Sequence, residues 1–149
     1  MLVYTDSRPA VKGQSKDRKF LRNGEIMPTI TAELSNISAA DANKNRTATF
    51  SPGNGNPAWS GVQNGGEIDA NGSGAAAADV VFNLTSGSPV SFSSSGPFTA
   101  TPASTEFSVT SNTGSSITVH DDNDVGSGTY EYTLHFSDGT RLDPRFINR

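Results

Sequence analysis

The chain has 149 residues, a net charge of −4 and no cysteine. This length allows one domain with its own core, and the lack of cysteine excludes disulfides, thiolate nucleophiles and thiolate metal sites. Hydrophobic residues make up only 33% of the sequence and charged residues 17%. Such a composition occurs in disordered chains and in all-β proteins. Because so few charges cannot hold a chain open by repulsion, we predict an all-β domain.

The first 26 residues differ from the rest of the chain. They hold six of the eleven basic residues and three acidic ones, whereas residues 27–149 carry a net charge of −7. Since no apolar periodicity runs through residues 1–26, we interpret them as a disordered basic extension. Three explanations stay open. Translation starts at Met27, shortly after a Gly-Glu pair that a purine-rich ribosome-binding sequence can encode; the segment is a plain flexible tail; or it is an arm that binds nucleic acid or another acidic partner.

Residues 27–149 show short stretches in which polar and apolar residues alternate, the pattern of half-buried strands. In residues 29–34, for example, Ile30, Ala32 and Leu34 share one face. No segment has the spacing of an amphipathic helix. The further predicted strands are 47–50, 58–62, 67–69, 80–84, 90–92, 106–110, 116–120, 129–136 and 141–147. Seven to nine short strands without helices predict an immunoglobulin-like antiparallel β-sandwich.

The last third of the chain narrows the topology. Tyr130, Tyr132, Leu134 and Phe136 fall on one face of the strand 129–136. A tyrosine near the start of such a strand is typical of immunoglobulin-like domains, where its hydroxyl bonds back across the corner. In residues 137–140 an Asp-Gly pair predicts a tight hairpin with a type I′ turn.

The sequence Leu-Asp-Pro-Arg-Phe-Ile-Asn at 142–148 resembles the ending of the small bacterial proteins grouped as the DP-EP family. Those proteins end in Asp-Pro, an apolar residue, Asn and then Glu-Pro; this chain ends at Arg149 without the second dipeptide. The resemblance covers about the last 30 residues. It implies an immunoglobulin-like sandwich and brings no activity, since the family is uncharacterised. Because Pro144 has no N–H, it is expected on an edge strand or at a bulge.

Three acidic residues between two predicted strands, Asp121, Asp122 and Asp124, offer the oxygen ligands that calcium prefers. The loop departs from an EF-hand, because no glutamate stands at the twelfth position. Calcium sites on sandwich loops need no such spacing. Calcium is therefore a possible cofactor, and the alternative is a solvated turn in which aspartate tolerates tight backbone geometry.

Trp59 is the only tryptophan of the chain. One interpretation makes it a stacking platform for a sugar ring, with the amides of Asn56 and Gln63 as hydrogen-bond partners. The other places it in the core on the third strand, as in many immunoglobulin-like domains. We favour the core, because tryptophan is highly buried on average.

No catalytic pattern stands out. The two histidines, His120 and His135, lack a nearby third metal ligand, and His135 is expected on the exposed face of its strand. No Gly-x-Ser-x-Gly elbow supports serine hydrolysis, and no phosphate-binding lysine follows a glycine-rich loop. We therefore expect no enzymatic activity.

Neither an apolar stretch of membrane-spanning length nor the apolar run of a signal peptide occurs in the sequence. We expect a soluble domain that stays in the cytoplasm or is exported by another route, without nucleic-acid or membrane partners. The first hypothesis for its function is a non-enzymatic accessory or structural domain that acts through protein contacts. The alternatives are a small carbohydrate- or calcium-binding module and a component of a virion or surface appendage.

Overall fold

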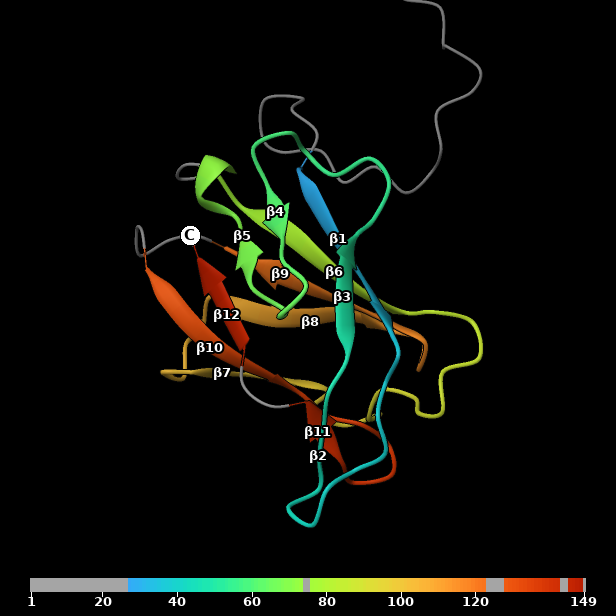
Figure 1. Ribbon diagram of the computed structural model, residues 1–149. Helices are drawn as coiled ribbons and strands as arrows, with labels where there is room; N and C mark the ends of the chain where they lie inside the picture. Colours follow the sequence, from blue (N-terminus) through green and yellow to red (C-terminus); the bar gives the residue numbers. More distant parts are fainter. Residues whose placement is uncertain (1–26, 74–75, 123–127, 143–144, 149) are drawn as a thin grey trace, which may run out of the picture.

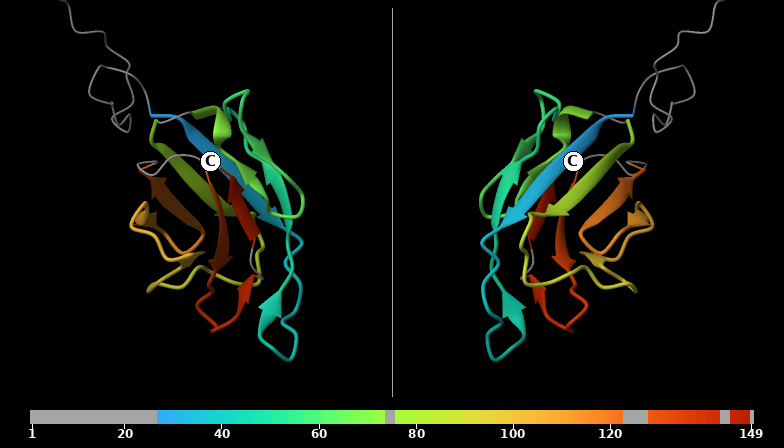
Figure 2. Two further views of the ribbon diagram at one scale, coloured as in Figure 1. Left: turned by 90° about the vertical axis from the view of Figure 1, so that its left-hand side faces the viewer. Right: turned by 90° about the vertical axis from the view of Figure 1, so that its right-hand side faces the viewer.

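The computed structural model describes residues 27–73, 76–122, 128–142 and 145–148, so the predicted extension lies outside the described residues. Two five-stranded sheets pack face to face (Figures 1 and 2). The first sheet has the order β3 (Thr49–Pro52), β1 (Thr29–Ser35), β6 (Ala78–Leu84), β9 (Ser116–Asp121) and β8 (Phe107–Asn112). The second has the order β4 (Gly61–Val62), β5 (Ile68–Asp69), β12 (Arg145–Asn148), β10 (Thr129–Leu134) and β7 (Phe98–Thr101). The predicted all-β sandwich is confirmed.

Two small elements complete the described fold. A parallel pair of two-residue strands, β2 (Asn45–Arg46) and β11 (Arg141–Leu142), lies at the lower end of the molecule in Figure 1. A single 3-10 turn, η1 (Asn71–Ser73), precedes β6. Eight of the described strands have four or more residues and four have only two. Since two residues cannot show an alternating pattern, the sequence predicted the longer strands best.

The sheets of the sandwich are mixed and not antiparallel throughout, as the predicted antiparallel sandwich would be. β1 and β6 run parallel in the first sheet, with Ile30 opposite Val80, and β5 and β12 run parallel in the second. The chain leaves the first sheet after β3, passes through β4 and β5 in the second sheet and then returns as β6. Such a crossover allows β6 to enter the sheet in the same direction as β1, which a hairpin does not.

The core lies between the sheets and follows the alternation of the sequence. Ile30, Ala32 and Leu34 of β1 are fully buried, as predicted. Beside them, Phe82 of β6 meets Phe98 and Tyr132 of the second sheet, and the three rings form a cluster whose centroids lie 5.3 to 6.3 Å apart. Aromatic contacts of this kind add to the free energy of burial itself. The sandwich is therefore held by apolar packing across its centre.

The predicted face of the last long strand is also confirmed: Tyr132, Leu134 and Phe136 are buried, and Tyr130 is half-buried. The hydroxyl of Tyr132 donates a hydrogen bond of 2.6 Å to the carbonyl oxygen of Gly66. Burial raises the pKa of the Tyr132 phenol, so the group stays protonated and donates. Its acceptor lies in the turn between β4 and β5, not at the neighbouring corner of immunoglobulin-like domains.

The hairpin at residues 137–140 differs from the predicted type I′ turn. Such a turn needs positive φ at both central residues, but here only Gly139 has one, of 80°. Gly139 donates its N–H to the carbonyl of Phe136, and Phe136 donates to the carbonyl of Thr140. This is a type I turn followed by a left-handed glycine. The carboxylate of Asp138 accepts the Thr140 N–H and so stabilises the ordinary backbone conformation of the aspartate.

Two other regions depart from the predicted strands. The segment 90–92 contributes only an isolated bridge between Phe92 and Phe136. Conversely, β7 was not predicted, since it is four residues long and flanked by Pro97 and Pro102, which interrupt any alternating pattern. Tertiary pairing with β10 makes this segment a strand.

Candidate functional site

Trp59 lies in the turn before β4, and 37% of its surface is exposed. The prediction that it fills the core is therefore wrong. The reason is local: a Cβ added to Gly72 would lie only 2.4 Å from the Cβ of Trp59. The indole thus rests against the bare backbone of η1, outside the layer between the sheets. One side of the ring system is covered there, and part of it reaches solvent.

The two amides predicted to accompany Trp59 have other surroundings. Asn56 binds the backbone of Thr31 with both ends of its amide, accepting from the N–H at 2.7 Å and donating to the carbonyl at 2.9 Å. Because both groups are engaged, Asn56 serves as a continuation of the sheet beyond β3. Gln63 lies in the β4–β5 turn, at the end of β4 opposite to Trp59. The three residues do not form one polar pocket.

The residues predicted to bind calcium point in different directions. Asp121 lies on the inner face of β9 and is buried, whereas the side chain of Asp122 is half exposed and bonds to the imidazole of His120. Consecutive residues of an extended chain face opposite sides of a sheet, so these two carboxylates do not converge on one cation. Asp124 lies outside the described residues. Among the residues that the structure describes, no group of three metal-ligating side chains is present.

The imidazole of His120 is held between two carboxylates on the outer face of the first sheet. Its Nδ1 lies 2.7 Å from Asp79 and its Nε2 lies 2.9 Å from Asp122. Asp79 stands directly beside His120 in the register of β6 and β9. Since both ring nitrogens are engaged, neither is available to take a proton from a nucleophile. The arrangement therefore fastens β6 to β9 and gives no catalytic triad.

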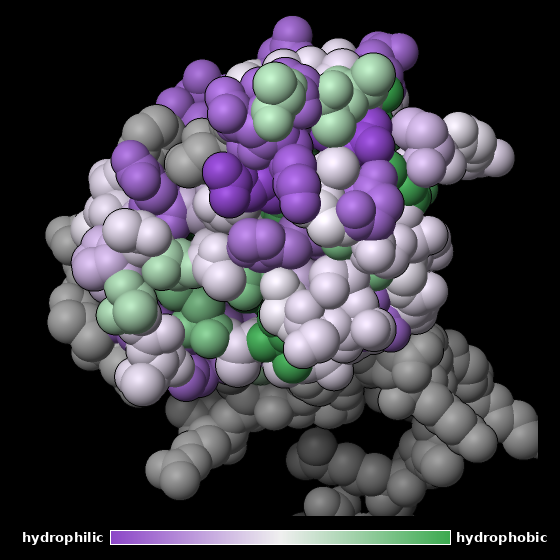
Figure 3. Space-filling view, turned by 90° about the horizontal axis from the view of Figure 1, so that it is seen from below, coloured by the Kyte–Doolittle hydropathy of each residue, from purple (hydrophilic) through white to green (hydrophobic). Residues whose placement is uncertain are grey.

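Arg46, at the end of the molecule where β2 and β11 pair, has structural partners. Arg46 donates to the hydroxyl of Thr140 at 2.7 Å and to the carboxylate of Asp138 at 2.8 Å, which joins β2 to the hairpin 137–140. The Thr140 hydroxyl, which donates to Asp138, is the main cause that lowers the pKa of this carboxyl. Seen from this end, the surface is mostly hydrophilic or neutral, with hydrophobic residues in separate small patches (Figure 3).

An open pocket of about 340 Å³ lies where β1 and β6 end, lined by residues 34–37 and 85–89. Its volume suits a small molecule. Hydroxyl groups and the amide of Asn36 line it beside apolar atoms, and none of the lining residues is charged or titratable. An activated nucleophile needs a neighbouring base, and the lining residues of this pocket include none.

The feature that sequence reasoning missed is the position of β8. This strand ends the first sheet, and five of its six residues, 108–112, are exposed. No segment in the described ranges pairs with its side away from β9. It contains no charged residue, proline or glycine. Residues 106–110 were predicted as a strand, but alternation does not show which strand of a sheet lies at its edge.

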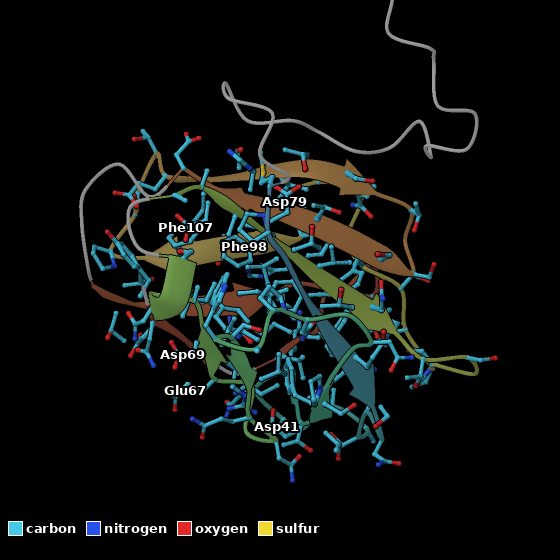
Figure 4. All side chains as sticks on the ribbon, turned by 90° about the horizontal axis from the view of Figure 1, so that it is seen from above. Asp41, Glu67, Asp69, Asp79, Phe98 and Phe107 are labelled. Carbon is cyan, nitrogen blue, oxygen red and sulfur yellow. The ribbon has the colours of Figure 1, made fainter. Side chains whose placement is uncertain are left out.

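One apolar side chain of β8 is uncovered. Val109 stands opposite the buried Val119 and so faces the inner side of the sheet, yet 38% of its surface is exposed. Near the start of the strand, the ring of Phe107 lies 5.8 Å from that of Phe98 in β7, and the two residues lie close together in Figure 4. The two sheets therefore meet at Phe107, and the inner face is open to solvent at Val109.

The other three edges of the two five-stranded sheets are protected. In β3 the N–H of Phe50 donates to the carbonyl of Asn64 in the β4–β5 turn, and the strand ends at Pro52. β4 has only two residues, and β7 lies between Pro97 and Pro102. Short strands and prolines prevent an edge from pairing with another chain. Among the edge strands of the two described five-stranded sheets, β8 is thus the one that is neither short nor flanked by proline, and its only irregularity is the register shift between Val109 and Ser111.

No protein-family model matches this chain, and a comparison with curated proteins finds none that resembles it in sequence. Within the described residues, no helix is long and apolar enough to cross a membrane.

Proposed function

We propose that this chain is a non-enzymatic accessory domain that acts through protein contacts, by adding an extended polypeptide segment to β8. The observation that carries the proposal is the exposed, uncharged strand from Ser108 to Asn112 with Val109 uncovered. Edge strands bind extended segments through backbone hydrogen bonds, and side chains of alternate residues supply the specificity. An incoming strand would also cover the open inner face at Val109.

The bulge in β8 limits the strength of such pairing. The register between β8 and β9 shifts between Val109 and Ser111, which leaves Thr110 as the extra residue. A bulge bends the strand and increases its local twist, so an added segment forms fewer continuous backbone hydrogen bonds than on a regular edge. We therefore expect a reversible contact.

A binding experiment with a defined probe tests this proposal. A blocked hexapeptide of alternating threonine and valine is titrated into the isotope-labelled full chain, and backbone amide shifts and hydrogen exchange are followed by NMR. We expect shifts and slower exchange concentrated at Val109–Asn112. A Val109→Lys variant should weaken binding at least tenfold, because an edge lysine opposes strand addition. Ser51→Lys, at an exposed position of β3, is the matched control. Equal effects of both variants, or no change at β8, would refute the proposal.

The exposure of Trp59 favours a second candidate, a carbohydrate-binding module. A partly exposed indole can stack on the apolar face of a sugar ring, and the exposed Asn71 in η1 lies in the element against which Trp59 packs. Titration with a panel of neutral oligosaccharides should then quench tryptophan fluorescence, and Trp59→Ala should abolish binding measured by calorimetry. Absence of heat and quenching at millimolar sugar would eliminate this candidate.

Membership of the DP-EP family and an immunoglobulin-like topology stay proposals. Their support is the C-terminal motif, of which Asp143 and Pro144 lie outside the described residues. A role in a virion or surface appendage would agree with an edge that adds strands, and it is the third candidate.

A further inference from the structure

The charge of the β8 edge restricts the kind of partner it fits. The whole chain carries a net charge of −4, so two copies repel each other weakly at long range. When identical strands pair, each charged side chain near the axis faces its own equivalent, which is destabilising. Residues 107–112 carry no charge, so this local repulsion is absent at β8. A strand that recognised a charged partner would instead present charges of the opposite sign.

Because β8 carries no charged residue, we propose that it pairs with β8 of a second copy of this chain, antiparallel across a two-fold axis. The inference rests on the proposed function, because it names the partner for the same edge. With the axis at Thr110, antiparallel self-pairing sets Thr110 against its equivalent and Val109 against Ser111 of the second copy. Pairs of threonine and serine across strands contribute about 0.2–1 kcal/mol each. The pairing also brings the two uncovered Val109 side chains to the new junction, where each loses contact with water.

The size of the contact sets its strength. The five exposed residues of β8, at about 3.4 Å each, span roughly 17 Å, so a strand pair alone covers less than the area of about 1,200–2,000 Å² found in stable complexes. The bulge at Thr110 reduces the regular pairing further. We therefore expect a weak dimer that dissociates on dilution and is not weakened by added salt, because salt screens the repulsion between two negative chains.

The number of free edges sets the size of the assembly. In the two described five-stranded sheets, the edges β3, β4 and β7 are covered, short or flanked by proline, the strands of the small β2–β11 sheet have two residues each, and β8 is the one longer edge left for pairing. A self-complementary contact that uses the same surface on both partners closes on itself. Assembly through β8 thus ends at two copies, joined through one continuous sheet of ten strands.

Sedimentation of the full chain over a wide concentration range tests the inference. The mass should rise from 15.6 kDa to twice that value and no further. Val109→Lys should weaken the association at least tenfold, as should Val109→Glu, and an equal mixture of the two variants should restore it. Ser51→Lys should associate like the original chain. A mass above that of a dimer, or a dimer unaffected by Val109→Lys, would overturn the inference.

Because the chain contains no cysteine, single-cysteine variants report proximity directly. Thr110→Cys should form a disulfide-linked dimer under mild oxidation much faster than Ser51→Cys, and equal rates would contradict the pairing. The two proposals fail separately. A chain that stays monomeric to millimolar concentration, yet binds the Thr-Val probe at β8, refutes self-pairing and keeps strand addition. If the chain neither dimerises nor binds the Thr-Val probe at β8, both proposals are refuted.

Discussion

The hydrogen bond from Tyr132 to Gly66 joins two parts of the chain that lie 66 residues apart in sequence, and removing one oxygen atom tests its contribution. Tyr132→Phe keeps the ring that packs against Phe82 and Phe98, at centroid distances of 5.3 and 5.8 Å. It deletes only the donor of the 2.6 Å bond to the carbonyl of Gly66. Since Gly66 is buried, its oxygen then has no replacement donor from water. The variant thus measures the bond with little change in packing.

The expected loss follows from the cost of an unsatisfied buried acceptor. Leaving a buried carbonyl without its hydrogen-bond donor lowers the free energy of unfolding by about 1–3 kcal/mol. Tyr132→Ala removes the ring contacts as well, and truncation of a buried aromatic residue costs about 3–5 kcal/mol. Replacing an exposed hydroxyl, as in Thr47→Val, should change the free energy of unfolding by less than about 0.5 kcal/mol. The three variants therefore form a graded series.

Urea unfolding at low protein concentration, followed by circular dichroism, gives the three free energies. The slope of unfolding against urea should stay constant, which shows that only stability has changed. If Tyr132→Phe unfolds within about 0.5 kcal/mol of the original chain, the bond to Gly66 does not contribute and the account of this contact is refuted. If Tyr132→Phe and Tyr132→Ala lose equal amounts, the aromatic cluster is not a packed unit.

Three further predictions concern stability and pH. Gly72→Ala should displace Trp59, since the new Cβ would lie 2.4 Å from it, and tryptophan emission should shift to the red; unchanged emission would contradict the contact. Burial, and then the charge of Arg141, lower the pKa of His135, so the unfolded chain binds a proton more readily and stability should fall as pH decreases below about 6.5. His135→Gln should flatten this part of the profile in thermal unfolding. The lowered pKa of Asp138 stabilises the fold above pH 3.8 and this contribution is lost below it, so Asp138→Asn should lower Tm at pH 7 and have little effect at pH 2.

Local alternation made much of the fold predictable. The stretches that became β1, β6, β9 and β10 were recognised as strands, with buried faces in β1 and β10 that the structure confirms. Their partners could not be read in the same way. Alternation every second residue shows which side chains share a face, but it carries no information on the direction of a strand. The parallel pairing of β1 and β6 depends on a crossover of more than 40 residues, which no local pattern encodes.

The candidate sites were harder to predict, for reasons specific to each. Hydrophobicity favoured a buried Trp59, but the glycine at position 72 creates an outer surface on which the indole rests. The consecutive aspartates 121 and 122 suggested one cation site, until the strand placed them on opposite faces. For β8, the sequence showed a strand, and its neutrality was visible. Its place at the edge depends on the order of five strands and becomes apparent only in the folded molecule.

The way in which the other sheet edges are protected indicates whether β8 pairs with a partner. An edge without prolines or charges is a hazard, because it can pair with an extended chain that it meets, and the bulge at Thr110 weakens such pairing without blocking it. Protection is available in this molecule, where backbone contacts, short length or flanking prolines guard the other described edges. A single lysine would guard β8, and at an exposed position it changes stability by less than about 0.5 kcal/mol. Yet Lys44 is the only lysine after Met27, and it lies outside the strands. Since protecting β8 would cost so little stability, its uncharged surface is better explained by pairing than by the needs of the fold.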